Sequence, residues 1–369
     1  MDTNISLYSK HRPMQLDEVV GQKHITDTLK HASQNNWFVH AYLFSGNRGT
    51  GKTSTARILA TLMTCDNPVN GKVCGKCRAC TTIPKDASLD VKELDGARNG
   101  LVDDIKILID SARWSPIELS HKIIIIDEVH RLSKGAVSAL LKILEEPPSY
   151  LTFILCTTEI EKMLDTITSR CQRYNFKRIT VKEIAQRLKE IAEKESILVD
   201  SDALLLLAKL ARGSMRDAIS SLGQVATFAN SEKISVGVVQ NCFCISDQHA
   251  IINIVKSIIE SKISLLLDQI NDLIVASVDV SQIMFEISEV FRNIMLLKAQ
   301  KGKRDLVDLT DNEIEVLEDI GKALTSSQLL KLAHIFSNIE KKMSFNINER
   351  WIMEATLINC IATLRSNNQ

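Results

Sequence analysis

Between Gly46 and Thr53 the chain reads GNRGTGKT, a set of residue types that can bind phosphate. An apolar run at 39–44 precedes this stretch, and a helical pattern at 54–63 follows it. In a strand–loop–helix arrangement, glycines let backbone N–H groups turn toward phosphate oxygens, and the helix N-terminus adds partial positive charge. Lys52 would contact the β- and γ-phosphates, and Thr53 would ligate Mg²⁺. An ordinary glycine-rich turn is the alternative. The full match in this context predicts a P-loop that binds ATP through Gly46, Asn47, Arg48, Gly49, Thr50, Gly51, Lys52 and Thr53.

Two acidic residues end a second apolar run, because Lys122 to Glu128 read KIIIIDE. Four consecutive isoleucines suit a central parallel strand that is covered on both faces. Ligands of open α/β sheets bind at the carboxyl ends of such strands. Asp127 would hold Mg²⁺ through its water shell, and Glu128 would polarise the attacking water. A solvated strand end with two inert carboxylates is the alternative, but beside a P-loop the pair predicts ATP hydrolysis.

Four of the nine cysteines cluster in a turn-rich segment, with the spacing C-x8-C-x2-C-x2-C. Two overlapping C-x2-C steps can wrap one ion, and four cysteines are typical of a closed structural Zn²⁺ site. An iron–sulfur cluster and four unrelated small apolar residues are the alternatives. We expect structural zinc at Cys65, Cys74, Cys77 and Cys80. The remaining five are expected in apolar cores: Cys156, Cys171, Cys242, Cys244 and Cys360.

Length and charge set limits on the class of protein. A chain of 369 residues is too long for one core and should form two or three domains. The 45 basic and 45 acidic side chains cancel, so any contact with nucleic acid requires a local cluster of charge. No apolar run approaches the roughly 20 residues that span a bilayer, and the first residues do not resemble a signal peptide. We therefore expect a soluble cytoplasmic protein without membrane contact.

All six prolines lie before Ser149. Helices tolerate interior proline poorly, so this asymmetry predicts a mixed N-terminal region followed by a helical remainder. Strands are expected at 39–44, 89–94, 122–126, 151–156 and near 174–177, with helices between them, which indicates a parallel α/β sheet. Helices are expected at 181–195, 202–211 and 214–229, and about five more beyond 240, including 280–300 and 326–343. We expect a loop at Lys301–Asp305.

Further motifs follow one another in a recognisable order over residues 5–230. Together they resemble the gamma/tau subunit of bacterial DNA polymerase III, the ATPase of the sliding-clamp loader. Beyond the P-loop and the cysteines, the matching segments are RP at Arg12–Pro13, VVGQ at Val19–Gln22, IIIIDEVH with Asp127, Glu128 and His130, ALLKILEEPP at Ala139–Pro148, SRC at Ser169–Cys171 and GSMRD at Gly213–Asp217. Other AAA+ proteins, such as Holliday-junction motors, are not expected to combine SRC with the cysteine insertion.

The resemblance implies an α/β plus all-α fold. It comprises an AAA+ P-loop NTPase domain with a parallel sheet at 1–178, a zinc-knuckle insertion at 65–80, a helical lid at 179–240 and a helical collar at 241–369.

The resemblance also implies roles for single residues. Arg170 is similar to the arginine finger that reaches a neighbouring subunit's ATP. Arg216 is similar to a nucleotide sensor on the lid. Thr157, or Thr158 in its place, is similar to the polar sensor after the fourth strand. Val19, Val20 and Arg12–Pro13 would shape the adenine pocket. From residue type alone, we would interpret Arg170 as a surface arginine and Arg216 as a member of a surface ion pair.

The family also implies partners: other clamp-loader subunits, the sliding clamp and primer–template DNA. Arg98, Asn99 and Lys142 match segments that track DNA phosphates, although solvated helix charges are the alternative. Gly100 and Ile105 stand where some relatives carry basic residues. The implied function is an ATP-driven motor that loads the clamp during replication, within a polymerase holoenzyme but without a polymerase active site. A branch-migration motor and a nucleotide-binding scaffold without turnover are the alternative functions.

Overall fold

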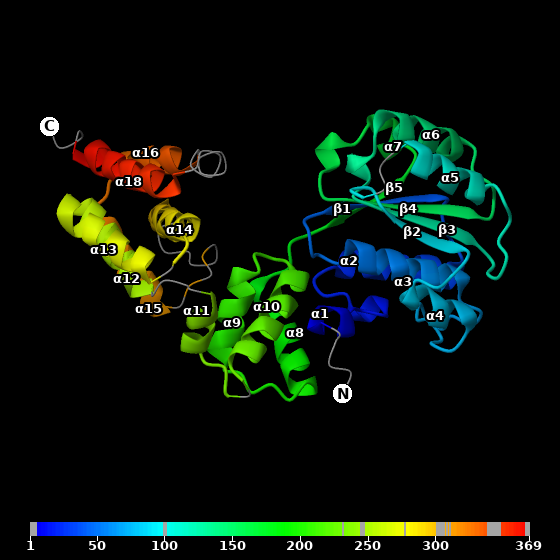
Figure 1. Cartoon of the computed structure of the whole chain (residues 1–369), viewed down its shortest axis with the longest axis horizontal. Helices are drawn as coiled ribbons and strands as arrows, with labels where there is room; N and C mark the ends of the chain where they lie inside the picture. Colours follow the sequence, from blue (N-terminus) through cyan, green and yellow to red (C-terminus); the bar gives the residue numbers. More distant parts are fainter. Residues whose placement is uncertain are drawn as a thin grey trace. The chain divides into compact units, whose positions relative to one another are not determined.

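The chain forms two compact units, Met1–Val236 and Gly237–Gln369, shown in a computed structural model in Figure 1. The structure describes residues 6–98, 102–230, 232–243, 248–276, 278–299, 307, 309, 311–337 and 348–365. Asn99, Gly100, Cys244 and the loop expected at Lys301–Asp305 lie outside these residues, as does the end of the helix expected at 326–343.

A five-stranded parallel sheet organises the first unit. Its strands are β1 (Ala41–Gly46), β2 (Val91–Asp95), β3 (Lys122–Asp127), β4 (Leu151–Thr157) and β5 (Gln172–Phe176). They are ordered β2-β3-β4-β1-β5. The carboxyl ends of β1, β4 and β3 are therefore neighbours, which brings together three segments that are distant in the sequence. The predicted parallel sheet is confirmed.

Helices cover both faces of the sheet (Figure 1). The faces alternate along each strand, because successive side chains point to opposite sides. Ile123 and Ile125 of β3 pack in a core with α2 (Lys23–Asn35) and α3 (Lys52–Thr64). Ile124 and Ile126 pack in the other core, with helices α5 (Val102–Ala112), α6 (Lys134–Glu145) and α7 (Asp165–Thr168). The isoleucine run is buried on both faces, as the sequence predicts.

Short elements complete this part of the unit. They are α1 (Leu7–Lys10), α4 (Arg78–Thr82) and the 3₁₀ turns η1 (Leu16–Glu18), η2 (Ile83–Lys85), η3 (Val129–Arg131) and η4 (Ile160–Lys162).

Three helices follow the sheet, α8 (Val181–Lys194), α9 (Ser201–Leu210) and α10 (Met215–Phe228). Side-chain caps explain where two of them begin. The Thr180 hydroxyl accepts the Glu183 N–H while Glu183 accepts the Thr180 N–H, which forms a capping box. The Ser214 hydroxyl accepts the Asp217 N–H at the start of α10. All three helices lie where the sequence predicts them.

The second unit is helical in the part of it that the structure describes. Its helices are α12 (Gln248–Ile259), α13 (Ile263–Val275), α14 (Val280–Ala299), α15 (Asp311–Lys322), α16 (Ser326–Ser337) and α18 (Glu349–Arg365), and α11 (Val236–Phe243) lies at the boundary between the units. The predicted apolar stripe of α14 packs into the core of the unit, with Ile283, Ile287 and Ile294 nearly fully buried. None of the described helices has the length and apolar content to span a bilayer.

Candidate nucleotide site and cysteine cluster

The P-loop connects β1 to α3, and its glycines adopt conformations that side chains would not allow. At Gly46, with φ 142°, a Cβ atom would lie 2.4 Å from the Phe176 carbonyl oxygen. At Gly49, with φ 74°, a Cβ atom would lie 1.9 Å from the Ser214 hydroxyl. The Met215 N–H donates to the Gly49 carbonyl at 3.0 Å, so the loop is hydrogen-bonded to the start of α10.

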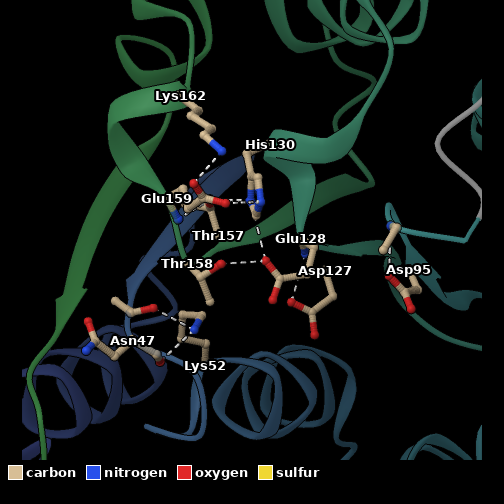
Figure 2. A network of polar contacts seen from close by, with 12 residues as sticks. Asn47, Lys52, Asp95, Asp127, Glu128, His130, Thr157, Thr158, Glu159 and Lys162 are labelled. Atoms are coloured by element: carbon tan, nitrogen blue, oxygen red, sulfur yellow. Dashed lines mark hydrogen bonds and ion pairs between the residues drawn. The ribbon is translucent and has the colours of Figure 1, made fainter. Parts of the chain in front are cut away.

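Lys52, the first residue of α3, folds back over its own loop. Its ammonium donates to the carbonyl oxygens of Gly46 at 2.7 Å and Asn47 at 2.9 Å (Figure 2). Burial lowers the pKa of this ammonium, and the negative charges of Asp127 and Glu128 offset part of the effect. A buried cation in this position is suited to a phosphate group.

The two predicted Mg²⁺ ligands lie side by side. The Thr53 hydroxyl donates to Asp127 Oδ2 at 2.6 Å, although the residues are 74 positions apart. Thr53 lies in the first turn of α3, and Asp127 ends β3. Hydroxyl and carboxylate oxygens are ligands that Mg²⁺ prefers, so the pair has the chemistry of a magnesium site.

Glu128 lies at the centre of a polar network shown in Figure 2. Its backbone is left-handed, with φ 48°, and its N–H donates to Asp127 Oδ1 at 2.9 Å. Its Oε2 accepts the Thr158 hydroxyl at 2.8 Å and lies 3.4 Å from His130 Nδ1. His130 Nε2 lies 3.0 Å from Glu159 Oε1, and Glu159 in turn pairs with Lys162 at 2.5 Å. The network thus links the carboxylate after β3 to the segment after β4.

The two adjacent threonines have different surroundings. Thr157 is fully buried; its hydroxyl lies 3.0 Å from His130 Nδ1 and accepts the Glu159 N–H at 3.0 Å. Thr158 is partly exposed and contacts Glu128 directly. Of the two candidates for the polar sensor, Thr158 is therefore the one that touches the carboxylate.

A cavity of about 870 Å³, counting the space that opens to solvent, lies over the P-loop. Its cationic lining residues are Arg12, Arg48, Lys52, Arg187 and Arg216. Pro13, Val19 and Val20 supply part of its apolar lining, and Glu18, Asp127 and Glu128 supply its carboxylates. An excess of positive charge beside an apolar wall suits a ligand that has phosphate groups and an aromatic ring.

Sequence reasoning missed several of the residues that line this cavity. The Arg216 guanidinium lies 4.7 Å from the centre of the Tyr8 ring, a cation–π contact between α10 and α1. Arg187 lines the cavity from α8 and is held by Glu190 at 2.8 Å. Neither Tyr8 nor Arg187 belongs to a recognisable motif, and only the packing of the helices against the sheet domain brings them to the cavity.

Arg170 is held away from this cavity and is not among its lining residues in the described part of the chain. Its guanidinium donates to Glu145 Oε1 at 2.6 Å and to the Thr166 carbonyl at 2.7 Å. About a third of the side chain is exposed, 34%. Arg170 is thus an oriented surface cation in its own subunit.

The candidate DNA contacts are exposed. The Arg98 side chain is 86% exposed and lies 3.7 Å from Asp95, and Lys142 is exposed on α6. Asn99 lies outside the described residues. Ile105 of α5 is fully buried in the core on the side of the helix that faces the sheet.

The four clustered cysteines bring their sulfur atoms within 4.8 Å of one another. The separations are 3.4 Å for Cys77–Cys80, 3.7 Å for Cys65–Cys80 and 3.8 Å for Cys65–Cys77 and Cys74–Cys80. Four sulfurs around one Zn²⁺ at the usual bond length would be about 3.8 Å apart. Hydrogen bonds from the backbone N–H groups of Lys76 and Cys77 lower the pKa of Cys74 to about 6, which favours its thiolate. The cluster is compatible with zinc.

Three families of DNA polymerase III subunits match consecutive parts of the chain. The family described as DNA polymerase III, delta subunit, matches 21–180, the clamp-loader ATPase lid domain matches 183–231, and domain III of subunits gamma and tau matches 234–367. The tau subunit of Bacillus subtilis is 36% identical over 97% of this chain and 63% of that protein. The tau subunit of Escherichia coli is 34% identical over 79% of this chain and 45% of that protein. The chain spans less than two thirds of the length of these two relatives.

Solved structures of a more distant protein share the fold. The RuvB Holliday junction branch migration motor of Thermotoga maritima superposes with a TM-score of 0.50 over 72% of this chain and 86% of that one. The sequences are 21% identical, so this likeness concerns the fold alone.

Proposed function

Because the chain belongs to the gamma and tau family of DNA polymerase III subunits, we propose that it is an ATP-hydrolysing motor subunit of a sliding-clamp loader. The observation that carries the proposal is the convergence of Lys52, Thr53, Asp127 and Glu128 on one cationic cavity. The work of the subunit is to couple ATP to the loading of the clamp onto primed DNA during replication. Polymerisation itself would belong to other subunits of the holoenzyme.

Each residue of the site would have a separate role in binding or hydrolysing ATP. The P-loop, Gly46 to Thr53, would bind the phosphates, with Lys52 exchanging its carbonyl contacts for phosphate oxygens. Thr53 and Asp127 would hold Mg²⁺, which neutralises charge on the phosphates when bound. Glu128 would orient the attacking water, while Thr158 or Thr157 serves as the polar sensor. Val20 would contact the adenine, and Arg216 would report nucleotide to the lid.

Arg170 would act on the ATP of a neighbouring subunit. The support is its exposure and its absence from the described lining of its own cavity. A finger of this kind stabilises the charge that develops on the phosphates in the transition state. Hydrolysis would then occur only where subunits meet, which requires assembly with other clamp-loader subunits.

We assign the remaining parts by the same reasoning. The sheet domain is 1–178, the lid 179–240 and the collar that holds the subunits in a ring 241–369. Cys65, Cys74, Cys77 and Cys80 would bind one Zn²⁺ as a structural ion, because all four positions around it would be filled. Arg98, Asn99 and Lys142 would contact the phosphates of primer–template DNA.

One experiment separates this function from its alternatives. The ATPase rate of the assembled loader should rise when primed DNA and the sliding clamp are added together. A branch-migration motor, the alternative that the sequence left open, should respond to DNA and ignore the clamp. A scaffold without turnover should show no ATPase activity under any condition. Stimulation that does not depend on the clamp would refute the proposed function.

A further inference from the structure

The cysteine-rich knuckle, residues 65–80, is tied to the segment Arg12–Val20 by a pair of hydrogen bonds. The Val73 N–H donates to Gln15 Oε1 at 3.2 Å, and Gln15 Nε2 donates to the Val73 carbonyl at 3.4 Å. One side-chain amide thus satisfies both backbone groups of the residue that precedes Cys74. Gln15 is partly buried, so the two bonds are shielded from competing water.

An ion pair adds a second connection beside the first. Lys72 of the knuckle lies 3.0 Å from Asp17 Oδ2, and Lys30 of α2 pairs with the other oxygen of Asp17. The loop also lies close to α2, because a Cβ atom at Gly71 would be 2.9 Å from Lys30 Cγ. The knuckle, the segment and α2 therefore meet around Asp17.

The segment to which the knuckle is tied forms one wall of the nucleotide cavity, through Arg12, Pro13, Glu18, Val19 and Val20. Internal hydrogen bonds make it a small structural unit. Glu18 accepts the N–H groups of Met14 at 2.7 Å and Gln15 at 3.3 Å. A displacement of Gln15 or Asp17 should therefore move the cavity wall with it.

Part of the space between this wall and the knuckle is a cavity rather than packed side chains. A second cavity of about 620 Å³, counting the space open to solvent, has Arg12 and Pro13 on one side and Val73, Gly75 and Cys80 on the other. The wall and the knuckle also share one hydrophobic core, in which Leu16 and Val19 are buried and Val73 is packed against them. The polar connections at Gln15 and Asp17 add to this packing beside the cavity. Their loss should let the wall shift.

We propose that the knuckle holds the wall of the nucleotide cavity in place and thereby sets nucleotide affinity, with Gln15 and Lys72 as its positioning residues. This inference rests on the proposed function, because it requires the cavity to bind nucleotide. It gives the cysteine insertion a role beyond its own folding. The cysteines shape the loop that presents Lys72 and Val73, and these two residues fix the segment opposite the P-loop.

The test compares two lysines of the same knuckle in the 369-residue chain. Lys72→Ala removes the pair with Asp17, whereas Lys76→Ala removes the same charge from an exposed side chain for which the described residues show no side-chain contact. Dissociation constants for ADP are measured by titration, with zinc content and thermal unfolding as controls. The double variant Gln15→Ala/Lys72→Ala should bind ADP about threefold to tenfold more weakly, the effect of losing one or two hydrogen bonds. Lys76→Ala should bind like the wild type.

Hydrogen exchange supplies a readout that does not depend on affinity. Exchange over 12–20 should be faster in Lys72→Ala and in the double variant, and unchanged in Lys76→Ala. If the double variant does not fold, the ADP affinity and hydrogen exchange of Lys72→Ala test the inference alone. This substitution is at an exposed position and leaves the hydrogen bonds of Gln15 in place.

The outcomes separate this inference from the proposed function. A wild-type chain that fails to bind ADP would overturn both. If the wild type binds ADP, and the folded variants retain the same affinity and the same exchange over 12–20, then the knuckle does not position the wall and only the present inference is lost.

Discussion

Glu128 is the residue whose environment bears most directly on catalysis. Its Oε2 accepts the Thr158 hydroxyl at 2.8 Å and lies 3.4 Å from His130, so two neighbours set its orientation. A carboxylate that orients water must be held in position, since a misplacement of about 1 Å can cost a hundredfold in rate. If Glu128 orients the attacking water, as we propose, the threonine contact would hold it in position.

This contact predicts that the two adjacent threonines respond differently to the same substitution. Thr158→Val should lower kcat about tenfold to a hundredfold, because Glu128 loses the donor that positions it, while ATP affinity stays close to that of the wild type. Thr157→Val should instead lower the free energy of unfolding by about 1–3 kcal/mol, because the buried hydroxyl that contacts His130 Nδ1 and accepts the Glu159 N–H is lost. Steady-state ATPase kinetics and chemical denaturation of both variants test this. Equal kinetic losses without a difference in stability would contradict it.

Thr157 and Thr158 also show which features of the site cannot be predicted from the sequence. The sequence predicted the lysine of the P-loop, the acidic pair and the cysteine cluster as residue types at recognisable spacing. It favoured Thr157 over Thr158 as the polar sensor, but which of the two contacts Glu128 depends on which way a side chain points at the end of β4. Tyr8 and Arg187 were missed because no local pattern marks them and only packing places them at the cavity.

At the scale of elements, Asp90 connects the start of β2 to the loop before β3. Its fully buried carboxylate accepts the N–H groups of Ile117 at 2.8 Å, Glu118 at 2.6 Å and Leu119 at 2.9 Å. Burial alone would raise the pKa of Asp90, but these three hydrogen bonds and the charge of Lys122 lower it below its usual value of 3.8. The loop thus depends on an ionised carboxylate.

The lowered pKa of Asp90 predicts an acid-dependent contribution to stability. A carboxyl group with a lower pKa in the folded state stabilises the protein above its unfolded pKa and loses this contribution as the pH falls through the folded one. The contribution should be complete at neutral pH and decline below about pH 4. Asp90→Asn should lower the free energy of unfolding at pH 7 by about 1–3 kcal/mol and flatten its dependence on pH in the acid range. Urea denaturation at a series of pH values measures both effects, and an unchanged acid slope would exclude Asp90 as the cause.

The cysteine knuckle gives a second prediction at this scale. Purified protein should contain about one zinc per chain. Cys77→Ser should lose the metal and destabilise residues 65–80, while ATP binding is weakened and not abolished, because the P-loop lies outside the knuckle. Metal analysis and hydrogen exchange over the knuckle test this. An absence of metal, or iron with visible absorbance, would refute the zinc assignment.

Elements differ in how well the sequence predicts them. Helices α8 and α10 lie close to their predicted bounds, and the structure shows that Thr180 with Glu183 and Ser214 cap their starts. The all-isoleucine part of β3 was recognised because both of its faces are buried. Short elements such as α1 and η1–η4 were not predicted, since a single turn leaves no periodic pattern. The placement of β1 between β4 and β5 comes from long-range pairing that no local pattern encodes.

For the whole molecule, a net charge of zero conceals a locally cationic site. Five basic residues from three separate parts of the chain line the nucleotide cavity: Arg12, Arg48, Lys52, Arg187 and Arg216. Burial lowers the pKa of Arg12, and the neighbouring charge of Arg57 adds to this effect. Arg170 stands apart from this group. An arginine that is held by Glu145 on an exposed surface is available to a second subunit.

The division between Lys52 and Arg170 predicts complementation between two defective variants. Arg170→Ala should bind ATP almost normally as an isolated chain, because it removes only a partly exposed pair worth about 0–1 kcal/mol. In the assembled, DNA-stimulated loader it should lose about 10³ or more in hydrolysis rate, the effect of a finger supplied by another subunit. Lys52→Ala should fail at the opposite half of the same composite site.

Mixing the two variants decides whether Arg170 acts on a neighbour. Some interfaces in a mixed assembly would pair an intact Lys52 with an intact Arg170 from the other variant, so part of the ATPase activity should return. Sizing by light scattering must show that both variants assemble as the wild type does. If assembly is normal and the mixture is no more active than either variant alone, Arg170 does not act in trans. If a monomeric Arg170→Ala chain loses an activity that monomeric wild type displays, the arginine serves its own site. The P-loop assignment would survive either result, because it rests on Lys52, Thr53 and Asp127 within one subunit.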